Sequence, residues 1–280
     1  MSTDERISLL DALVAAGIDP SRMMPSTGCC SIVETVALTA HAVKHGCAGV
    51  LMLPPFYYKN VSEEGLYRYF SEVVQRVGDA RLRIYLYHIP PVAIVGITLR
   101  LVERLLKAYP SAIAGMKDSS GDWNNTKTFL EAFTESARPA GTEFDVFVGS
   151  ESFLLANMRN GGAGTISATA NVNPAAIYEL YTVASAVSAD LDLESQQRRL
   201  NVVREVFSST KFPSMIAALK QAIAIYANDP DWARVRPPLV ELTPEQAKLL
   251  AEELKAVGFA MKGIRETDQK SRKSDFGDTM

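Results

Sequence analysis

The sequence predicts an α/β fold with a parallel sheet, and two observations support this fold class. Short apolar runs alternate with amphipathic segments through the first two thirds of the chain, and each apolar run ends in turn residues. Six such runs open, in order, at Met23, Gly49, Leu82, Ile113, Phe144 and Ala163. Strict alternation of strand and helix is typical of parallel strands joined by right-handed crossovers. The 280 residues suffice for one α/β barrel or for two average domains.

The N-terminal elements follow from local signals. Ser2 and Glu5 have the spacing of a capping box, and apolar residues continue at helical intervals as far as Gly17. Residues 23–28 are expected to form a short strand and turn, and residues 32–44 a second helix.

The later strands and helices are expected to alternate in the same way. The expected strands cover residues 49–53, 82–87, 113–117, 144–149 and 162–167. Five helices are expected between and after these strands. The first begins at Ser62, the second covers Leu99 to Ala108, the third has Asp122 as its cap, the fourth covers residues 153–158 and the fifth begins at Pro174.

The C-terminal third has a different character. No further strand is expected between Leu191 and Gly258, where three amphipathic segments cover residues 191–206, 213–226 and 244–257. We therefore expect a barrel over residues 1–188, a helical extension over 189–263 and a disordered, charged tail over 264–280.

Composition excludes several classes of partner. A net charge of −3 and a pI near 5.7 provide no basic field for nucleic acid or anionic lipid. No apolar run approaches the ~20 residues that span a bilayer, and the N-terminus is charged. Cys29, Cys30 and Cys47 are too few for a disulfide framework. We therefore expect a cytoplasmic protein with neither nucleic acid nor membrane as partner.

Lys117 is the candidate nucleophile. It ends the apolar run that begins at Ile113, just before Asp118-Ser119-Ser120-Gly121, so it is expected at the mouth of the α/β core. A half-buried lysine amine loses its proton more readily, and the neutral amine can attack a carbonyl. On position alone, however, a solvated loop lysine is the commoner outcome.

Five fragments occur in an order that resembles one enzyme family. They are Pro54-Pro55-Phe56-Tyr57-Tyr58, Ser62-Glu63-Glu64-Gly65-Leu66, Tyr87-His88-Ile89-Pro90, Gly115-Met116-Lys117-Asp118-Ser119-Ser120-Gly121 and Gly161-Gly162-Ala163-Gly164-Thr165-Ile166-Ser167. From about Ser2 to Gly258 the chain resembles the dihydrodipicolinate synthase / N-acetylneuraminate lyase family of pyruvate-dependent class I aldolases.

The resemblance implies a (β/α)8 barrel, of which six strands are present, with a Schiff-base lysine at Lys117 and a proton-relaying tyrosine at Tyr87. It further implies pyruvate or another 2-oxo acid and an aldehyde as substrates, no metal and no organic cofactor. Lys117 and Tyr87 end strands one β/α unit apart, which places their backbones about 4.8 Å apart if the strands are neighbours. A phenol beside an amine can move the protons that imine formation requires.

Four further residues are candidates for the site. By the resemblance, Tyr58 lies at a subunit contact and reaches the neighbouring subunit's site, which implies a homo-oligomer, a dimer or tetramer; plain surface packing is equally compatible. Gly164, Thr165 and Ile166 are candidate substrate-binding residues, because a glycine lets a ligand approach backbone amides. Close packing of helix on strand is the alternative there.

Metal and nucleotide sites are not expected. His41 and His45 have the i, i+4 spacing of a helical metal pair, but Ala42-Val43-Lys44 supplies no carboxylate and no third ligand is evident. Gly161-Gly162-Ala163-Gly164 lacks the lysine of a phosphate loop.

Two departures from the family pattern remain. The two β/α units before Ser2, with their Gly-Thr-Thr-Gly-Glu loop, are not in this sequence. The arginine with which lysine-biosynthetic members hold the aldehyde's carboxylate is also absent, because Pro90 runs into Pro91-Val92-Ala93-Ile94. The leading hypothesis is an aldolase or lyase acting on a longer 2-oxo acid. The alternatives are a 4-hydroxy-tetrahydrodipicolinate synthase and a compromised barrel that only binds a 2-oxo acid or a partner subunit.

Overall fold

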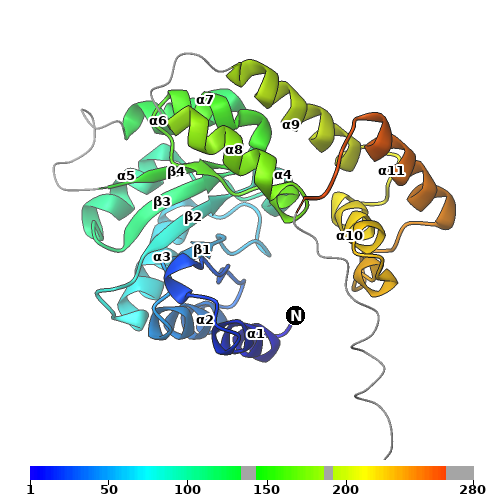
Figure 1. The fold of residues 1–280 in the computed structure, drawn as a ribbon. Helices are drawn as coiled ribbons and strands as arrows, with labels where there is room; N and C mark the ends of the chain where they lie inside the picture. Colours follow the sequence, from blue (N-terminus) through cyan, green and yellow to red (C-terminus); the bar gives the residue numbers. More distant parts are fainter. Residues whose placement is uncertain (134–142, 186–191, 263–280) are drawn as a thin grey trace, which may run out of the picture. The chain divides into compact units, whose positions relative to one another are not determined.

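A five-stranded parallel sheet lies in the N-terminal part of the chain (Figure 1). The computed structural model describes residues 1–133, 143–185 and 192–262. The strands are β1 (Val50–Met52), β2 (Ile84–His88), β3 (Ile113–Asp118), β4 (Asp145–Val148) and β5 (Gly164–Thr165). Their order in the sheet is their order in the chain, and each pairs with the next in parallel. The predicted α/β class and parallel sheet are therefore confirmed.

The expected strand at residues 23–28 is reduced to an isolated bridge between Ser26 and Leu51. Thr27 donates its N–H to Leu51 O, and Leu51 donates its N–H to Pro25 O, both at 2.9 Å. A preceding rung of this ladder would need an N–H at position 25, and proline has none. The expectation of six strands is therefore wrong for the described residues, which contain five strands and this bridge.

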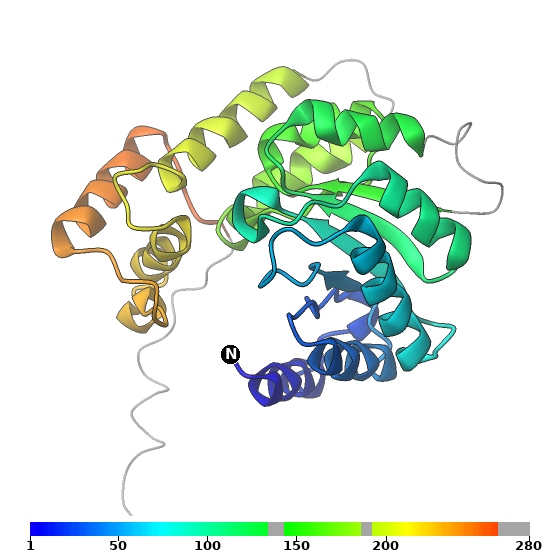
Figure 2. The same cartoon turned by 180° about the vertical axis from the view of Figure 1, so that it is seen from behind.

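Helices cover the outer face of the sheet (Figure 2). The helices of this unit are α1 (Thr3–Ala15), α2 (Ile32–Lys44), α3 (Glu63–Val77), α4 (Pro90–Ala93), α5 (Leu99–Ala108), α6 (Trp123–Ala132) and α7 (Leu154–Arg159), with the short 3-10 helices η1 (Pro20–Arg22) and η2 (Glu151–Phe153). Several begin where the sequence predicts: Ser2 and Glu5 form the capping box of α1, Ser62 caps α3 and Asp122 caps α6.

The main core lies between the strands and these helices. Met52, Ile84 and Leu86 of the strands are fully buried together with Phe70 of α3 and Leu101 of α5. Alternate strand residues point to opposite faces. The residues between them, such as Tyr85 and Tyr87, therefore lie on the inner face.

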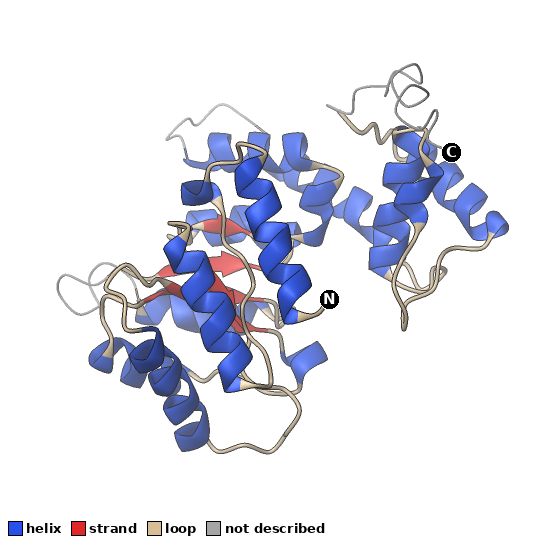
Figure 3. Ribbon diagram, turned by 90° about the horizontal axis from the view of Figure 1, so that it is seen from below, coloured by secondary structure: helices blue, strands red, loops and turns tan. Residues whose placement is uncertain are grey.

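The C-terminal part of the chain is helical, as expected. Its elements are η3 (Ala168–Asn171), α8 (Pro174–Ser185), α9 (Leu193–Phe207), α10 (Met215–Tyr226), η4 (Pro230–Ala233) and α11 (Pro244–Ala256). A separate core gathers the buried side chains of α9, α10 and α11 around Phe207, Leu250 and Leu254. The view coloured by secondary structure shows red strands only in the N-terminal part (Figure 3).

The contacts divide the chain into two compact units, Met1–Ile166 and Ser167–Met280. By contacts α8 groups with α9, whereas the sequence places it in the barrel. The expected boundary between residues 188 and 189 stays a prediction, and the expected tail at 264–280 lies outside the described residues. Within the described parts of the chain, none of the helices has the length and apolar character that crossing a membrane requires.

Candidate active site

Lys117 and Tyr87 meet at the carboxyl ends of two neighbouring strands. They are direct partners in the register of β2 and β3, so their side chains leave the same face of the sheet. Lys117 Nζ donates a hydrogen bond to Tyr87 Oη at 3.1 Å and lies 4.2 Å from the centre of the tyrosine ring. Only 9% of Lys117 is exposed. The amine therefore sits in a largely buried position with a phenol as its direct proton partner.

A second polar pair lies one layer deeper on the same face. Tyr85, two residues before Tyr87, donates from its hydroxyl to Asp145 Oδ2 at 3.1 Å. Burial raises the pKa of Tyr85 to about 12, and the charge of Asp145 acts in the same direction. Tyr85 thus keeps its proton at neutral pH. We assign it a structural role beneath Lys117.

Gly115 makes room for this deeper layer. A Cβ at Gly115 would lie 2.3 Å from Asp145 O and 2.9 Å from the Tyr85 ring. Any larger residue would displace the layer on which Lys117 rests. Sequence analysis did not single out Tyr85 or Asp145, although the period of two along β2 places Tyr85 on the face of Tyr87.

Asp118 fixes the turn that follows Lys117. Its side chain is 3% exposed and accepts hydrogen bonds from Ser120 N at 2.8 Å, Asn125 Nδ2 at 3.0 Å and Thr126 Oγ1 at 2.6 Å. These bonds tie the end of β3 to α6. Asp118 therefore positions Lys117 from the opposite face of the strand.

The Ser119 hydroxyl is buried and lacks a hydrogen-bond partner among the described residues. It packs against Gly149, where a Cβ would lie 1.9 Å from the Ser119 Oγ. A buried hydroxyl two residues after Lys117 is a further candidate contact for a substrate, and sequence analysis had not named it.

Comparison with known proteins places this arrangement in a family. The model of the dihydrodipicolinate synthetase family matches residues 1–257. The chain belongs to this family. The enzyme class expected from the sequence, a lyase of the aldolase type, is thereby confirmed, and the alternative of a barrel that only binds is not favoured.

Relatives within the dihydrodipicolinate synthetase family match most of the chain. An uncharacterized DapA-like lyase of Chloroflexus aurantiacus is 31% identical over 250 residues, covering 89% of this chain and 78% of the relative. The 4-hydroxy-tetrahydrodipicolinate synthase of Thermus thermophilus is 34% identical over 240 residues, covering 86% and 75%. The crystal structure of dihydrodipicolinate synthase from Agrobacterium tumefaciens matches with a TM-score of 0.77 at 32% identity, covering 91% of this chain and 82% of that chain. These matches confirm the barrel fold of the family.

The predicted substrate-binding residues Gly164, Thr165 and Ile166 make hydrogen bonds to other residues of the chain. Thr165 Oγ1 and Ile166 N both donate to Val148 O, at 2.9 and 3.0 Å. Gly164 O accepts from Asn157 Nδ2 at 2.9 Å. A Cβ at Gly162 would overlap the Asn157 side chain. Close packing, the alternative considered for this segment, thus accounts for Gly162, and substrate binding by Gly164, Thr165 and Ile166 stays a prediction.

Tyr58 is not part of the Lys117 cluster within one chain. It is 75% exposed, stacks edge-on against Tyr57 and makes no hydrogen bond to Lys117 or Tyr87 among the described residues. The neighbouring Lys59 Nζ donates to Phe56 O and to Ala93 O, the latter at 3.2 Å, which joins the loops after β1 and β2. The predicted entry of Tyr58 into a neighbouring subunit's site stays a prediction.

His88 provides a pH-dependent element beside Tyr87. Its ring is buried, and its Nδ1 accepts the N–H of Ile97 at 2.9 Å. Burial lowers the pKa of His88, although the charge of Asp118 acts in the opposite direction. A histidine with a depressed folded-state pKa gives stability that is complete above its unfolded pKa of about 6.5 and is lost as the pH falls below it.

We expect replacement of His88 by asparagine to reduce the acid sensitivity of the fold, because the amide oxygen can accept from Ile97 without titrating. Thermal unfolding measured at about pH 7.5 and about pH 5.5 should show a larger loss of stability in the wild type than in His88→Asn. Equal losses in the two proteins would contradict a role for His88.

Proposed function

We propose that this chain makes or breaks a carbon–carbon bond next to the carbonyl of pyruvate or another 2-oxo acid, with Lys117 as the nucleophile. The observation that carries the proposal is the 3.1 Å hydrogen bond between Lys117 Nζ and Tyr87 Oη on the inner face of the sheet. Membership in the dihydrodipicolinate synthetase family supports it.

The amine and the phenol fit the steps of imine chemistry. The neutral Lys117 amine attacks the 2-oxo carbon to form a carbinolamine, whose hydroxyl leaves as water once Tyr87 protonates it. The resulting iminium accepts the electron pair of the adjacent C–H bond while the Tyr87 phenolate takes that proton. The enamine then attacks an aldehyde carbon, and Tyr87 returns the proton to the alkoxide that forms. Water hydrolyses the product iminium and returns the free amine.

Borohydride trapping tests the proposal directly. Hydride adds to the iminium carbon and leaves a stable secondary amine, so pyruvate plus borohydride should attach a three-carbon group to Lys117, seen by peptide mass spectrometry. A folded protein that carries no adduct at Lys117 would remove the lysine from the mechanism.

Our proposal for the aldehyde partner is based on the residues after β2. Val92 stands in the segment where lysine-biosynthetic members have arginine, and it is 73% exposed. Arg100 pairs with Glu63 at 3.3 Å and is thus occupied on the helices. We therefore favour an aldehyde without a carboxylate at this point over 4-hydroxy-tetrahydrodipicolinate synthesis, the activity named for the Thermus relative. Faster turnover of the carboxylate-bearing aldehyde in a direct comparison would reverse this preference.

We also propose that the chain forms a homo-oligomer, a dimer or tetramer, in which Tyr58 enters the neighbouring site. The exposed run Phe56-Tyr57-Tyr58, with exposed fractions of 38%, 74% and 75%, supports this proposal. Exposed aromatic surface of this kind is favourable to bury by association.

Complementation between subunits tests the role of Tyr58. Tyr58→Ala and Lys117→Ala should each be nearly inactive alone, whereas a mixture should regain part of the activity, because one site then combines an intact Lys117 with an intact Tyr58. Light scattering and a tagged-subunit pull-down should establish that subunits exchange. Exchange without recovered activity would show that Tyr58 does not act across an interface.

A further inference from the structure

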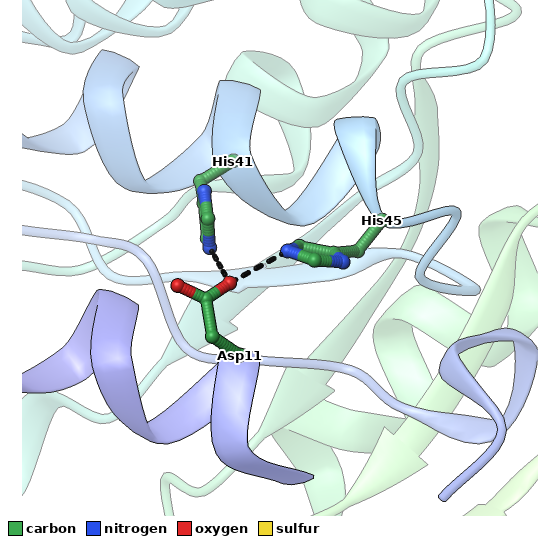
Figure 4. Close-up of side chains that lie close together, drawn as sticks. All are labelled: Asp11, His41 and His45. Atoms are coloured by element: carbon green, nitrogen blue, oxygen red, sulfur yellow. Dashed lines mark hydrogen bonds and ion pairs between the residues drawn. The ribbon is translucent and has the colours of Figure 1, made fainter. Parts of the chain in front are cut away.

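Three potential metal ligands converge on the outer layer of the first unit. Asp11 comes from α1, and His41 and His45 come from α2 (Figure 4). Both histidines direct Nε2 at the same oxygen, Asp11 Oδ1, at 2.8 Å each. The three ligand atoms lie within 4.8 Å of one another.

The packing of α1 on α2 creates this cluster. Residues i and i+4 share one face of a helix, which brings His41 and His45 together with their ring centroids 4.6 Å apart. Leu10 of α1 is buried in the same core as Ala42 and Val43 of α2. The core contact therefore sets the distance at which Asp11 meets the two rings.

Asp11, 30 residues before His41 in the sequence, supplies the carboxylate that the residues between the two histidines lack. In the sequence, the residues between the two histidines supply no carboxylate, and no third ligand is evident. Only the crossing of α1 and α2 brings Asp11 to them, so the spacing along the chain could not reveal it. The expectation of no metal was based on an incomplete set of ligands.

Two imidazoles and one carboxylate form a donor set for a divalent transition metal. Such ions take histidine nitrogen and carboxylate oxygen at about 2.0–2.2 Å, which corresponds to a separation of roughly 3.3 Å between ligand atoms in a tetrahedral site. The present 2.8 Å separations would need to open by about half an ångström. The Asp11 side chain is 49% exposed and can rotate to give this space.

Exposure also leaves positions open for water. The His41 and His45 side chains are 18% and 24% exposed and that of Asp11 is 49% exposed, so the cluster lies at the surface of the unit. Mg²⁺ and Ca²⁺ prefer oxygen ligands and therefore fit a site with two imidazole nitrogens poorly. Zn²⁺, with water completing its coordination, is the appropriate probe.

We propose that Asp11, His41 and His45 bind a divalent transition metal ion that links α1 to α2. Each neutral imidazole offers the lone pair of Nε2 and keeps its proton on Nδ1, and Asp11 Oδ1 moves from the hydrogen bonds to the ion. The site uses the outer helices, whereas Lys117 lies on the inner face of the sheet. The link is structural and separate from the proposed chemistry of Lys117.

Calorimetric titration of the untagged full chain with Zn²⁺ tests the site. We expect one ion per chain at this site, and a rise in the thermal unfolding temperature at saturation because the ion binds the folded state. Asp11→Asn and His45→Gln should each weaken binding on the order of 10-fold or more and reduce the thermal shift. Both replacements are at accessible positions and keep the side-chain size, so the fold should survive.

Two controls make the result specific. Asp4→Asn removes another exposed carboxylate of α1, and His88→Asn removes the third histidine of the chain. Neither should change Zn²⁺ affinity. The site is overturned by wild-type protein that does not bind, or by affinity that is unchanged in both cluster variants. With Co²⁺ as the probe, thiolate charge-transfer absorption in place of a nitrogen and oxygen spectrum would assign the ion to the cysteines and also overturn it.

Discussion

Lys117→Ala is expected to abolish both turnover and borohydride trapping by pyruvate. The amine is the only group of the Lys117–Tyr87 pair that can form an imine, and loss of a covalent nucleophile typically costs on the order of 10⁴-fold or more in rate. Because the Lys117 side chain is largely buried, its truncation should lower the unfolding free energy by about 1–3 kcal/mol while the protein stays folded. Steady-state kinetics, peptide mass spectrometry and thermal unfolding measure the three quantities.

Lys127→Ala is the matched control for this variant. Lys127 lies on α6, is 49% exposed and pairs with Glu131 at 3.5 Å. Its replacement therefore removes an amine from the helix that follows β3 without changing the Lys117–Tyr87 pair. Turnover and trapping should match the wild type. Activity retained in Lys117→Ala, or an adduct that moves to another lysine at an undiminished rate, would show that the wrong amine was assigned.

The spacing of apolar residues, together with the turn and capping residues, predicted the helices and strands around Lys117 well. The helix over Leu99–Ala108 has the predicted bounds, and Asp122 accepts from Asn124 N as the cap of α6. Such features depend on residues within a few positions of one another. The sequence predicted that Lys117 lies beside Tyr87 if their strands are neighbours, and β2 and β3 are neighbours.

Features that depend on contacts between distant segments were harder to predict. Residues 23–28 have the composition of a strand, yet Pro25 removes a donor that the ladder with β1 needs. Asp145 meets Tyr85 across β3, over the space left by Gly115. A short apolar run shows neither which backbone donor is missing nor which residue lies across the next strand.

The site is less completely predicted than the fold for the same reason. The resemblance named Lys117 and Tyr87 because their motifs are local, whereas Asp118 acts through Asn125 and Thr126 on the following helix. That the Ser119 hydroxyl is buried without a hydrogen-bond partner among the described residues can be seen only once its neighbours in the fold are known. Residues that position a catalytic group are therefore the part of this site that needed the structure.

Tyr87→Phe is expected to slow turnover by about 10²- to 10⁴-fold, the usual scale for a lost general acid–base group. The variant keeps the ring that packs beside Lys117 and removes only the hydroxyl that the amine contacts. Imine trapping should persist, because the nucleophile remains and water can move the protons more slowly.

The control for Tyr87→Phe is Tyr85→Phe, which removes a hydroxyl from the same strand and the same face. Tyr85 bonds to Asp145 and keeps its proton at neutral pH, so its loss should lower stability by roughly 1 kcal/mol while slowing turnover much less than Tyr87→Phe does. Turnover and trapping should be followed together in the wild type and both variants. If Tyr87→Phe turns over at the wild-type rate, or if Tyr85→Phe is the slower of the two, proton relay does not pass through Tyr87.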